Sequence, residues 1–156
     1  VDGDRVTVWP VALGEQRSQT VIYGATHNMG NSVVGKAVSD YPNQRFELPT
    51  PVIVERYDRL VSNRDVALLK MDTQGFECNV VRGMGDEFER IGILKTEVAA
   101  KWLAAQDGCS DQILFDLFHE RQRIVTTNDG VHISMPGPAG VYDVVVRPRD
   151  STKFAV

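Results

Sequence analysis

Length, composition and charge limit what this chain can be. Its 156 residues are 42% hydrophobic, 24% charged and 8% aromatic, which is typical of one globular domain with a hydrophobic core. The 17 basic and 21 acidic residues give a net charge of −4 at pH 7, and Lys and Arg form no cluster. We therefore expect a single domain over residues 1–156, with no nucleic acid and no membrane surface as partner.

The two cysteines, Cys78 and Cys109, belong to no CxxC motif and have no Cys/His metal spacing around them. We interpret both as reduced thiols of an intracellular protein, with a disulfide between them as the alternative. No apolar run reaches the length of about 18 residues that a membrane span needs, and the N-terminus lacks the layout of a signal peptide. We expect a cytoplasmic protein. The chain begins at Val1 and not at Met, so any targeting segment would belong to a longer precursor.

The first part of the chain predicts short strands around an irregular segment. Strand-like patterns occur at 5–13, 20–23 and 52–55, and a helical turn is expected at 57–61. Residues 24–51 have no periodicity and are rich in Gly, Asn, Ser and Pro, so we expect a long loop or irregular insertion that is either functional or mobile.

The second part alternates strands with helices. Residues 66–71 are apolar except for Lys70, the pattern of a strand covered on both faces. A helix interrupted at Gly83 and Gly85 follows to Phe88. The remaining expected elements are strand 92–97, helix 111–122, strand 123–127, turn 128–130, strand 131–134 and strand 142–147. This order predicts an α/β fold with a mostly parallel sheet, and the closing hairpin predicts an antiparallel C-terminal edge.

Two carboxylates follow or end predicted strands. Asp72 comes directly after strand 66–71, and Glu97 ends strand 92–97. Ligands of open parallel sheets bind beyond the carboxyl ends of the strands. If these two strands are neighbours, both carboxylates therefore lie at one rim of the sheet.

The residues after Asp72 predict how the next helix begins. Thr73 is a candidate N-cap, Gly75 lets backbone amides approach a bound group, and Glu77 lies in the first turn, where the helix dipole favours a negative charge. The alternative is that Asp72 and Glu77 only cap the helix.

Other residues suggest chemistry more weakly. His27, in the long loop, is either a substrate-side base or a solvated loop residue. His119 and His132 have no partners at metal-ligand spacing, so we expect no metal site. Trp102 either stacks on a substrate ring or packs in the interior.

Residues 30–37 (GNSVVGKA) have the spacing of a phosphate-binding loop, except that Ala37 replaces the Ser or Thr that binds Mg²⁺. Pro42 leaves little room for the long helix that should follow such a loop. The pattern therefore does not favour nucleotide hydrolysis.

The segment ALLKMDTQGFECNVVRGM, residues 67–84, resembles the signature of the FkbM-type methyltransferases, which are S-adenosylmethionine-dependent O-methyltransferases. Their pattern is Leu-Lys-Ile-Asp-x-(Glu/Gln)-Gly-x-Glu, followed by an apolar helix that ends in Arg-Gly. The matching residues are Leu69, Lys70, Asp72, Gln74, Gly75, Phe76, Glu77, Val81, Arg82 and Gly83. Residues 8–14 (VWPVALG) resemble the family's third strand and its Ala-Leu-Gly turn, 52–60 the strand and turn before the signature, and 93–97 (ILKTE) the strand that ends in glutamate.

The resemblance implies a partial class I methyltransferase fold, which is Rossmann-like. It begins near the family's third strand, so the glycine-rich cofactor loop after the first strand and the acidic residue that ends the second have no counterpart. We expect either the C-terminal part of a longer enzyme or a reduced homologue that has lost its cofactor half.

Carried over to this chain, the resemblance implies S-adenosyl-L-methionine as cofactor, with Ala12, Leu13 and Asp72 as its contacts. Asp72 and Glu97 become the expected catalytic residues. A carboxylate at this position would accept the proton of a substrate hydroxyl or orient that hydroxyl toward the methyl group.

The expected substrate-binding residues are Gly75, Glu77 and His27, and the expected acceptor is a hydroxyl of a small metabolite or sugar. A non-catalytic, methyltransferase-like module that acts in binding or assembly is the alternative. Loss of the first strands would expose a sheet edge, so a homodimer through that edge is also expected.

Overall fold

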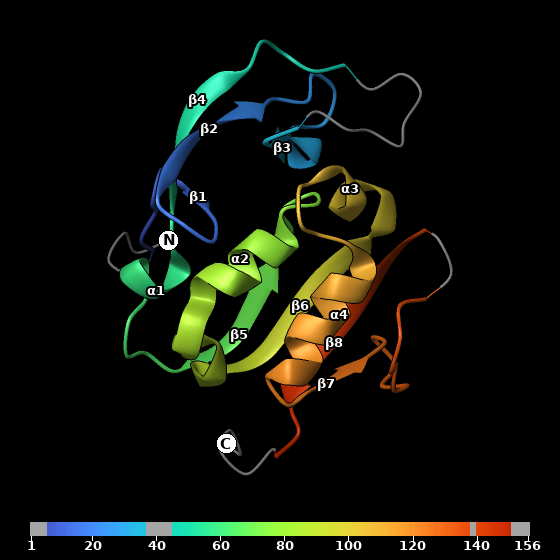
Figure 1. The fold of residues 1–156 in the computed structure, drawn as a ribbon. Helices are drawn as coiled ribbons and strands as arrows, with labels where there is room; N and C mark the ends of the chain where they lie inside the picture. Colours follow the sequence, from blue (N-terminus) through green and yellow to red (C-terminus); the bar gives the residue numbers. More distant parts are fainter. Residues whose placement is uncertain (1–5, 37–44, 138–139, 151–156) are drawn as a thin grey trace.

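The computed structural model describes residues 6–36, 45–137 and 140–150 and contains two four-stranded sheets with helices beside them (Figure 1). The first sheet has the order β1-β4-β2-β3, formed by β1 (Ala12–Leu13), β2 (Ser18–Tyr23), β3 (Val33–Val34) and β4 (Thr50–Glu55). The second has the order β5-β6-β8-β7, formed by β5 (Val66–Met71), β6 (Ile91–Ala99), β7 (Arg123–Thr126) and β8 (Val141–Pro148). The helices are α1 (Tyr57–Leu60), α2 (Glu77–Met84), α3 (Ala100–Ala105) and α4 (Asp111–Glu120), with 3₁₀ helices η2 (Met29–Asn31) and η3 (Gly85–Arg90).

Both sheets are mixed. The parallel pairs are β1 with β4 and β5 with β6, whereas the other strand pairs of the described residues are antiparallel. The predicted α/β class is therefore confirmed, but the mostly parallel sheet is wrong for this part of the chain. Strand β8 is antiparallel to β7 because no crossover helix lies between these two strands in the described residues, and it is also antiparallel to β6. The predicted antiparallel C-terminal part of the sheet is confirmed.

Several element boundaries differ from the sequence-based expectation. Of the predicted strand 5–13, the structure describes residues 6–13, and of these only Ala12 and Leu13 pair as a strand. Residues 131–134 contribute one isolated bridge, from His132 to Thr126, in place of a strand. The expected irregular segment contains η2, β3 and the start of β4, and helix α3 was not predicted. Strand β3 lies within the phosphate-loop pattern, while Ala37 and Pro42 lie outside the described residues.

Strand β5 has the predicted bounds, but it is not buried on both faces as predicted. It is the edge strand of its sheet, and Leu68 is 63% exposed. Leu69 and Met71, which alternate with Leu68, pack toward the core. The prediction of a strand covered on both faces is wrong because Leu68 and Lys70, on one face of β5, are exposed.

The hydrophobic core lies between the second sheet and helices α2 and α4, which lie side by side on one face of it (Figure 1). Its buried members recur every three to four residues along each helix, as an amphipathic helix requires. They include Val80, Val81 and Met84 of α2, Leu114, Phe115 and Phe118 of α4, and Leu94, Val144 and Val146 of the sheet. No helix among the described residues is long and apolar enough to cross a membrane.

The first sheet meets α2 through direct backbone contact. A Cβ atom at Gly83 would lie 2.0 Å from the carbonyl oxygen of Gly14, which follows β1. No side chain fits between the two segments, so glycine at position 83 allows their close approach.

Gly83→Ala tests this contact. Alanine in a helix interior normally stabilises by about 1 kcal/mol over glycine. Here we expect the overpacked contact to lower the free energy of unfolding by about 1 to 3 kcal/mol, measured by urea denaturation. Gly137→Ala is the matched control, because its Cβ would meet the Tyr142 ring at an ordinary 3.4 Å. Equal or higher stability of Gly83→Ala would contradict the contact.

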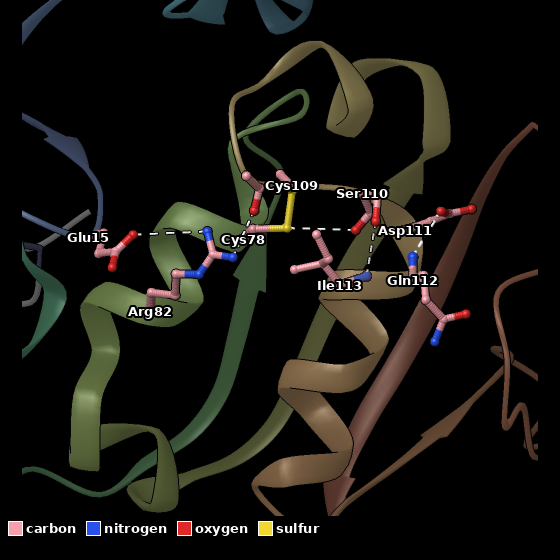
Figure 2. The surroundings of a disulfide bond; sticks show 9 residues. Glu15, Cys78, Arg82, Cys109, Ser110, Asp111, Gln112 and Ile113 are labelled. Atoms are coloured by element: carbon pink, nitrogen blue, oxygen red, sulfur yellow. Dashed lines mark hydrogen bonds and ion pairs between the residues drawn. A yellow bond between two sulfur atoms is a disulfide. The ribbon is translucent and has the colours of Figure 1, made fainter.

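Cys78 and Cys109 form a disulfide, with their Cα atoms 5.8 Å apart (Figure 2). The interpretation of both as reduced thiols was therefore wrong. Strand β6 and helix α3 bring the chain back to α2. The segment before α4, which contains Cys109, therefore passes the first turn of α2, which contains Cys78. Arg82 strengthens the same junction, because its Nη2 donates to the Gly108 carbonyl at 2.7 Å. Ser110 caps α4 by accepting from the Ile113 amide at 3.1 Å.

The double variant Cys78→Ser, Cys109→Ser should be less stable by about 3 to 4 kcal/mol, the chain-entropy value for opening a loop of this length. The sequence separation of the two cysteines is 31. Chemical denaturation with and without dithiothreitol measures the loss. The reductant should destabilise the unaltered chain and leave the double variant unchanged. Insensitivity of the unaltered chain to the reductant would contradict the bond.

Candidate functional site

Parallel pairing of β5 with β6 brings the two predicted carboxylates to one rim. Met71 lies opposite Thr96 in the register, so Asp72 and Glu97 follow at the same level of adjacent strands. Both line one pocket at the carboxyl ends of these strands, which we call the rim pocket. It is lined by Lys70, Met71, Asp72, Lys95, Thr96, Glu97 and Asp143.

The charged residues of the rim pocket share one face of the sheet. Lys70 pairs with Lys95 across β5 and β6, and Glu97 pairs with Asp143 across β6 and β8. Residues directly opposite each other on neighbouring strands point to the same face. Thr96, which alternates with these residues, is buried toward the helices. The wall of the rim pocket is therefore polar and charged.

Ion pairs place opposite charges beside two of the carboxylates. Lys70 Nζ lies 2.8 Å from Asp72 Oδ2, and Lys95 Nζ lies 3.3 Å from Asp143 Oδ2. These side chains are partly solvent-exposed, so the pairs add little stability, but they fix the directions of the carboxylates.

The pKa values of Asp72 and Glu97 move in opposite directions. Burial alone would raise the pKa of Asp72, but hydrogen bonds from Lys70 and Gln74 outweigh it and hold the pKa below its ordinary value. Burial raises the pKa of Glu97, and the negative charges of Asp72 and Asp143 raise it further. Environments that separate two pKa values in this way distinguish a proton acceptor from a carboxylate that stays ionised.

A left-handed turn connects Asp72 to helix α2. The φ angles of Gln74 and Gly75 are +52° and +102°. A residue other than glycine in this conformation costs about 1 to 3 kcal/mol, and such strain is often found at functional sites. Gln74 is only 8% exposed, and its Nε2 donates to Asp72 Oδ1 at 2.7 Å.

The turn also explains why Thr73 is not the N-cap. Helix α2 starts at Glu77 and its cap position is Phe76, because the left-handed residues delay the first helical turn. The backbone N–H of Thr73 donates to Glu77 Oε1 at 3.0 Å. The predicted cap is therefore wrong, and the carboxylate of the first turn closes the loop instead.

Glu77 lies beneath the turn and not in the wall of the rim pocket. It is 2% exposed, and within the described residues its Oε2 has no hydrogen-bond partner. Burial raises its pKa despite hydrogen bonds from backbone amides of the turn. Its placement in the first helical turn agrees with the sequence-based expectation.

Gly75 is a point of close packing. A Cβ atom there would lie 2.6 Å from the Trp102 carbonyl oxygen, so helix α3 packs directly on the turn. Trp102 is 5% exposed, which favours the packing role over stacking on a substrate. The space beside Gly75 is thus filled by the chain itself.

The remaining predicted site residues lie elsewhere. Leu13 lines a separate, largely apolar pocket with Trp9, Tyr57 and Leu69, and Ala12 lies beside it in β1. His27 is exposed in the segment after β2. Within the described part of the chain, the rim pocket is lined by none of Ala12, Leu13 and His27.

Sequence reasoning missed two charged residues of the rim pocket, Lys95 and Asp143. Asp143 reaches Glu97 only through pairing of β8 with β6, a contact between distant segments. Its signal is one acidic residue inside the apolar strand YDVVVR. Among the described residues, no group of three His, Cys, Asp or Glu is arranged to hold a metal ion.

Comparison with known proteins identifies the family. Residues 2–123 match the model of the methyltransferase FkbM domain, which includes the signature turn, Asp72 and Glu97. The chain belongs to the FkbM methyltransferase family, as the resemblance of residues 67–84 to the family signature predicted. Neither the curated proteins nor the solved structures contain a match.

Glu77→Gln tests the burial of this carboxyl group. A raised pKa means that the fold favours the protonated acid, so stability is full below the unfolded pKa and is lost as pH rises through the folded pKa. Glutamine is neutral at every pH in this range, so the variant does not lose this stability as the pH rises. We expect equal stability in acid and an excess of about 1 to 2 kcal/mol for the variant at pH 7.

Thermal unfolding between pH 3.5 and 7.5, a range of about 4 units around the ordinary carboxyl pKa, measures the difference. Glu120→Gln, which changes an exposed residue of α4, is the control for the substitution itself. A Glu77→Gln curve parallel to that of the unaltered chain would contradict a raised pKa.

Proposed function

We propose that this protein transfers the methyl group of S-adenosylmethionine to a hydroxyl of a small metabolite or sugar, and that the acceptor binds at the rim pocket. Its membership of the FkbM family supports a methyltransferase. The observation that carries the proposal is the pair of carboxylates, Asp72 and Glu97, at one rim with pKa values moved apart.

The two carboxylates have different roles. Glu97, whose pKa is raised, would accept the hydroxyl proton as general base when the hydroxyl oxygen bonds to the methyl carbon, and the sulfur would keep the electron pair of its broken bond to that carbon. Asp72 stays ionised and orients the acceptor, since Lys70 and Gln74 hold its charge in place. Proximity and orientation supply much of the rate of such a transfer. The charged wall of the rim pocket suits an acceptor with several hydroxyl groups.

The described residues fit part of the cofactor. S-Adenosylmethionine supplies an electrophilic methyl group on a positively charged sulfur. The ionised Asp72 would complement that charge, whereas the apolar pocket beside Leu13 is separate from the rim pocket and includes Val66 at the start of β5. Gly75 and Glu77 contribute by shaping the turn that carries Asp72.

A non-catalytic module is the second candidate, and the open sheet edges favour it. Strands β1 and β5 are both edge strands, and one apolar pocket is lined by residues of both, including Leu13, Val66 and Leu69. Unpaired edges beside apolar surface favour the addition of another strand. We propose that a second copy can pair there to give a homodimer, and a monodisperse monomer by light scattering would count against it.

The disulfide affects the expected location. Disulfides persist in oxidising compartments and are rare in the cytosol. We therefore propose that the protein works in an oxidising compartment, in place of the cytoplasm expected from the sequence. Alkylation of intact cells before lysis should find Cys78 and Cys109 protected; free thiols in that experiment would restore the cytoplasmic interpretation.

Calorimetric titration of S-adenosylmethionine into the chain is the first test, and micromolar binding would support a cofactor site within this chain or across its dimer. With an acceptor, Glu97→Gln should lower transfer by about 10²-fold to 10⁴-fold, because a general base is lost. The affinity of the Glu97→Gln variant for S-adenosylmethionine should stay within a few fold of that of the unaltered chain. Asp72→Asn should also abolish transfer, whereas Asp116→Asn on exposed α4 should have no effect. No binding heat would favour a fragment of a longer enzyme or the non-catalytic module, and unchanged turnover in both site variants would overturn the proposal.

A further inference from the structure

Gln74 carries two structural costs at one position. Its backbone adopts a left-handed φ of +52°, which glycine would adopt more easily. Its side-chain Oε1 is buried and has no partner within the described residues. Buried polar atoms are nearly always hydrogen-bonded, so a residue with both features needs a reason to be there.

The side-chain amide faces Asp72, and Glu97 lies at the same level on the adjacent strand. The Nε2 of Gln74 donates to Asp72 Oδ1 at 2.7 Å, and hydrogen bonding from Gln74 also lowers the pKa of Glu97. The opposite amide orientation would place Oε1 against the Asp72 carboxylate, where two acceptors repel. Asp72 therefore fixes the orientation, and the NH₂ group has one N–H for each carboxylate.

We infer that Gln74 is a positioning residue whose side-chain amide bridges Asp72 and Glu97 and holds the two carboxylates at a fixed separation. This inference rests on the proposed function, in which Asp72 and Glu97 hold the acceptor hydroxyl. Two carboxylates on adjacent strands repel each other. An amide that donates to both offsets the repulsion without adding charge.

Packing alone gives a different expectation for the same residue. If Gln74 only filled the turn, glycine would relieve the strained φ, and the carboxylates would titrate as before. If Gln74 bridges them, its removal leaves each carboxylate with fewer donors and more exposed to the charge of the other. Both pKa values would then rise.

The test compares Gln74→Gly and Gln74→Asn with the unaltered chain. The glycine variant accepts the backbone conformation and removes the amide. The asparagine variant keeps the amide and tolerates left-handed backbone, but it is one carbon shorter and reaches at most one carboxylate. Carboxyl ¹³C NMR titration of the whole chain follows Asp72 and Glu97, and thermal unfolding checks the fold.

We expect upward shifts of both titration midpoints in Gln74→Gly, with an unchanged or higher melting temperature. Gln74→Asn should shift at least one of them. Unchanged midpoints in the glycine variant, or a shift of Asp72 alone, would overturn the bridge. If the glycine variant does not fold, unchanged midpoints for both carboxyls in Gln74→Asn would overturn it.

The titration needs no methyl transfer, so its outcome is separable from that of the proposed function. A chain that binds no S-adenosylmethionine but shows both shifts would keep the bridge and refute the activity. A chain that binds S-adenosylmethionine and transfers the methyl group without these shifts would keep the proposed function and refute the bridge.

Discussion

The parallel pairing of β5 with β6 is the constraint on which the candidate site depends. Its register places Asp72 at the level of Glu97, and the antiparallel return of β8 adds Asp143. Because paired residues share a face, the charged side chains gather on one side of the sheet, while the alternating Met71 and Thr96 are buried on the other. A slip of one residue would reverse this arrangement.

Close backbone contacts hold the turn after Asp72 in place. Gly75 lets α3 pack on the turn, Gly83 lets the segment after β1 approach α2, and the disulfide joins α2 to the segment before α4. The two glycine contacts leave no room for a side chain, and the disulfide keeps the two segments that it joins from separating. The Arg-Gly end of the signature thus has a physical role, since Arg82 and Gly83 contact two different neighbours of α2.

Electrostatics then gives the two carboxylates of the rim different properties. Asp72 gains hydrogen bonds that favour its charge, whereas Glu97 is affected mainly by burial and by neighbouring negative charges. Glu77, although part of the same signature, is buried below the turn and serves its closure. One short segment therefore contains carboxylates with separate roles, one that stabilises the turn and one that faces the pocket.

The sequence by itself determined the α/β class, the bounds of β5, the positions of α2 and α4, and the placement of Asp72 directly after β5, whereas β6 continues past Glu97 to Ala99. These features follow from local periodicity and from a short motif, which neighbouring residues specify. Only the tertiary structure decided the mixed sheet order, the exposure of Leu68, the disulfide, and the presence of Asp143 and Lys95 in the rim pocket. Those features depend on which distant segments pair, and strand pairing is set by packing of the whole chain rather than by the residues of any one strand.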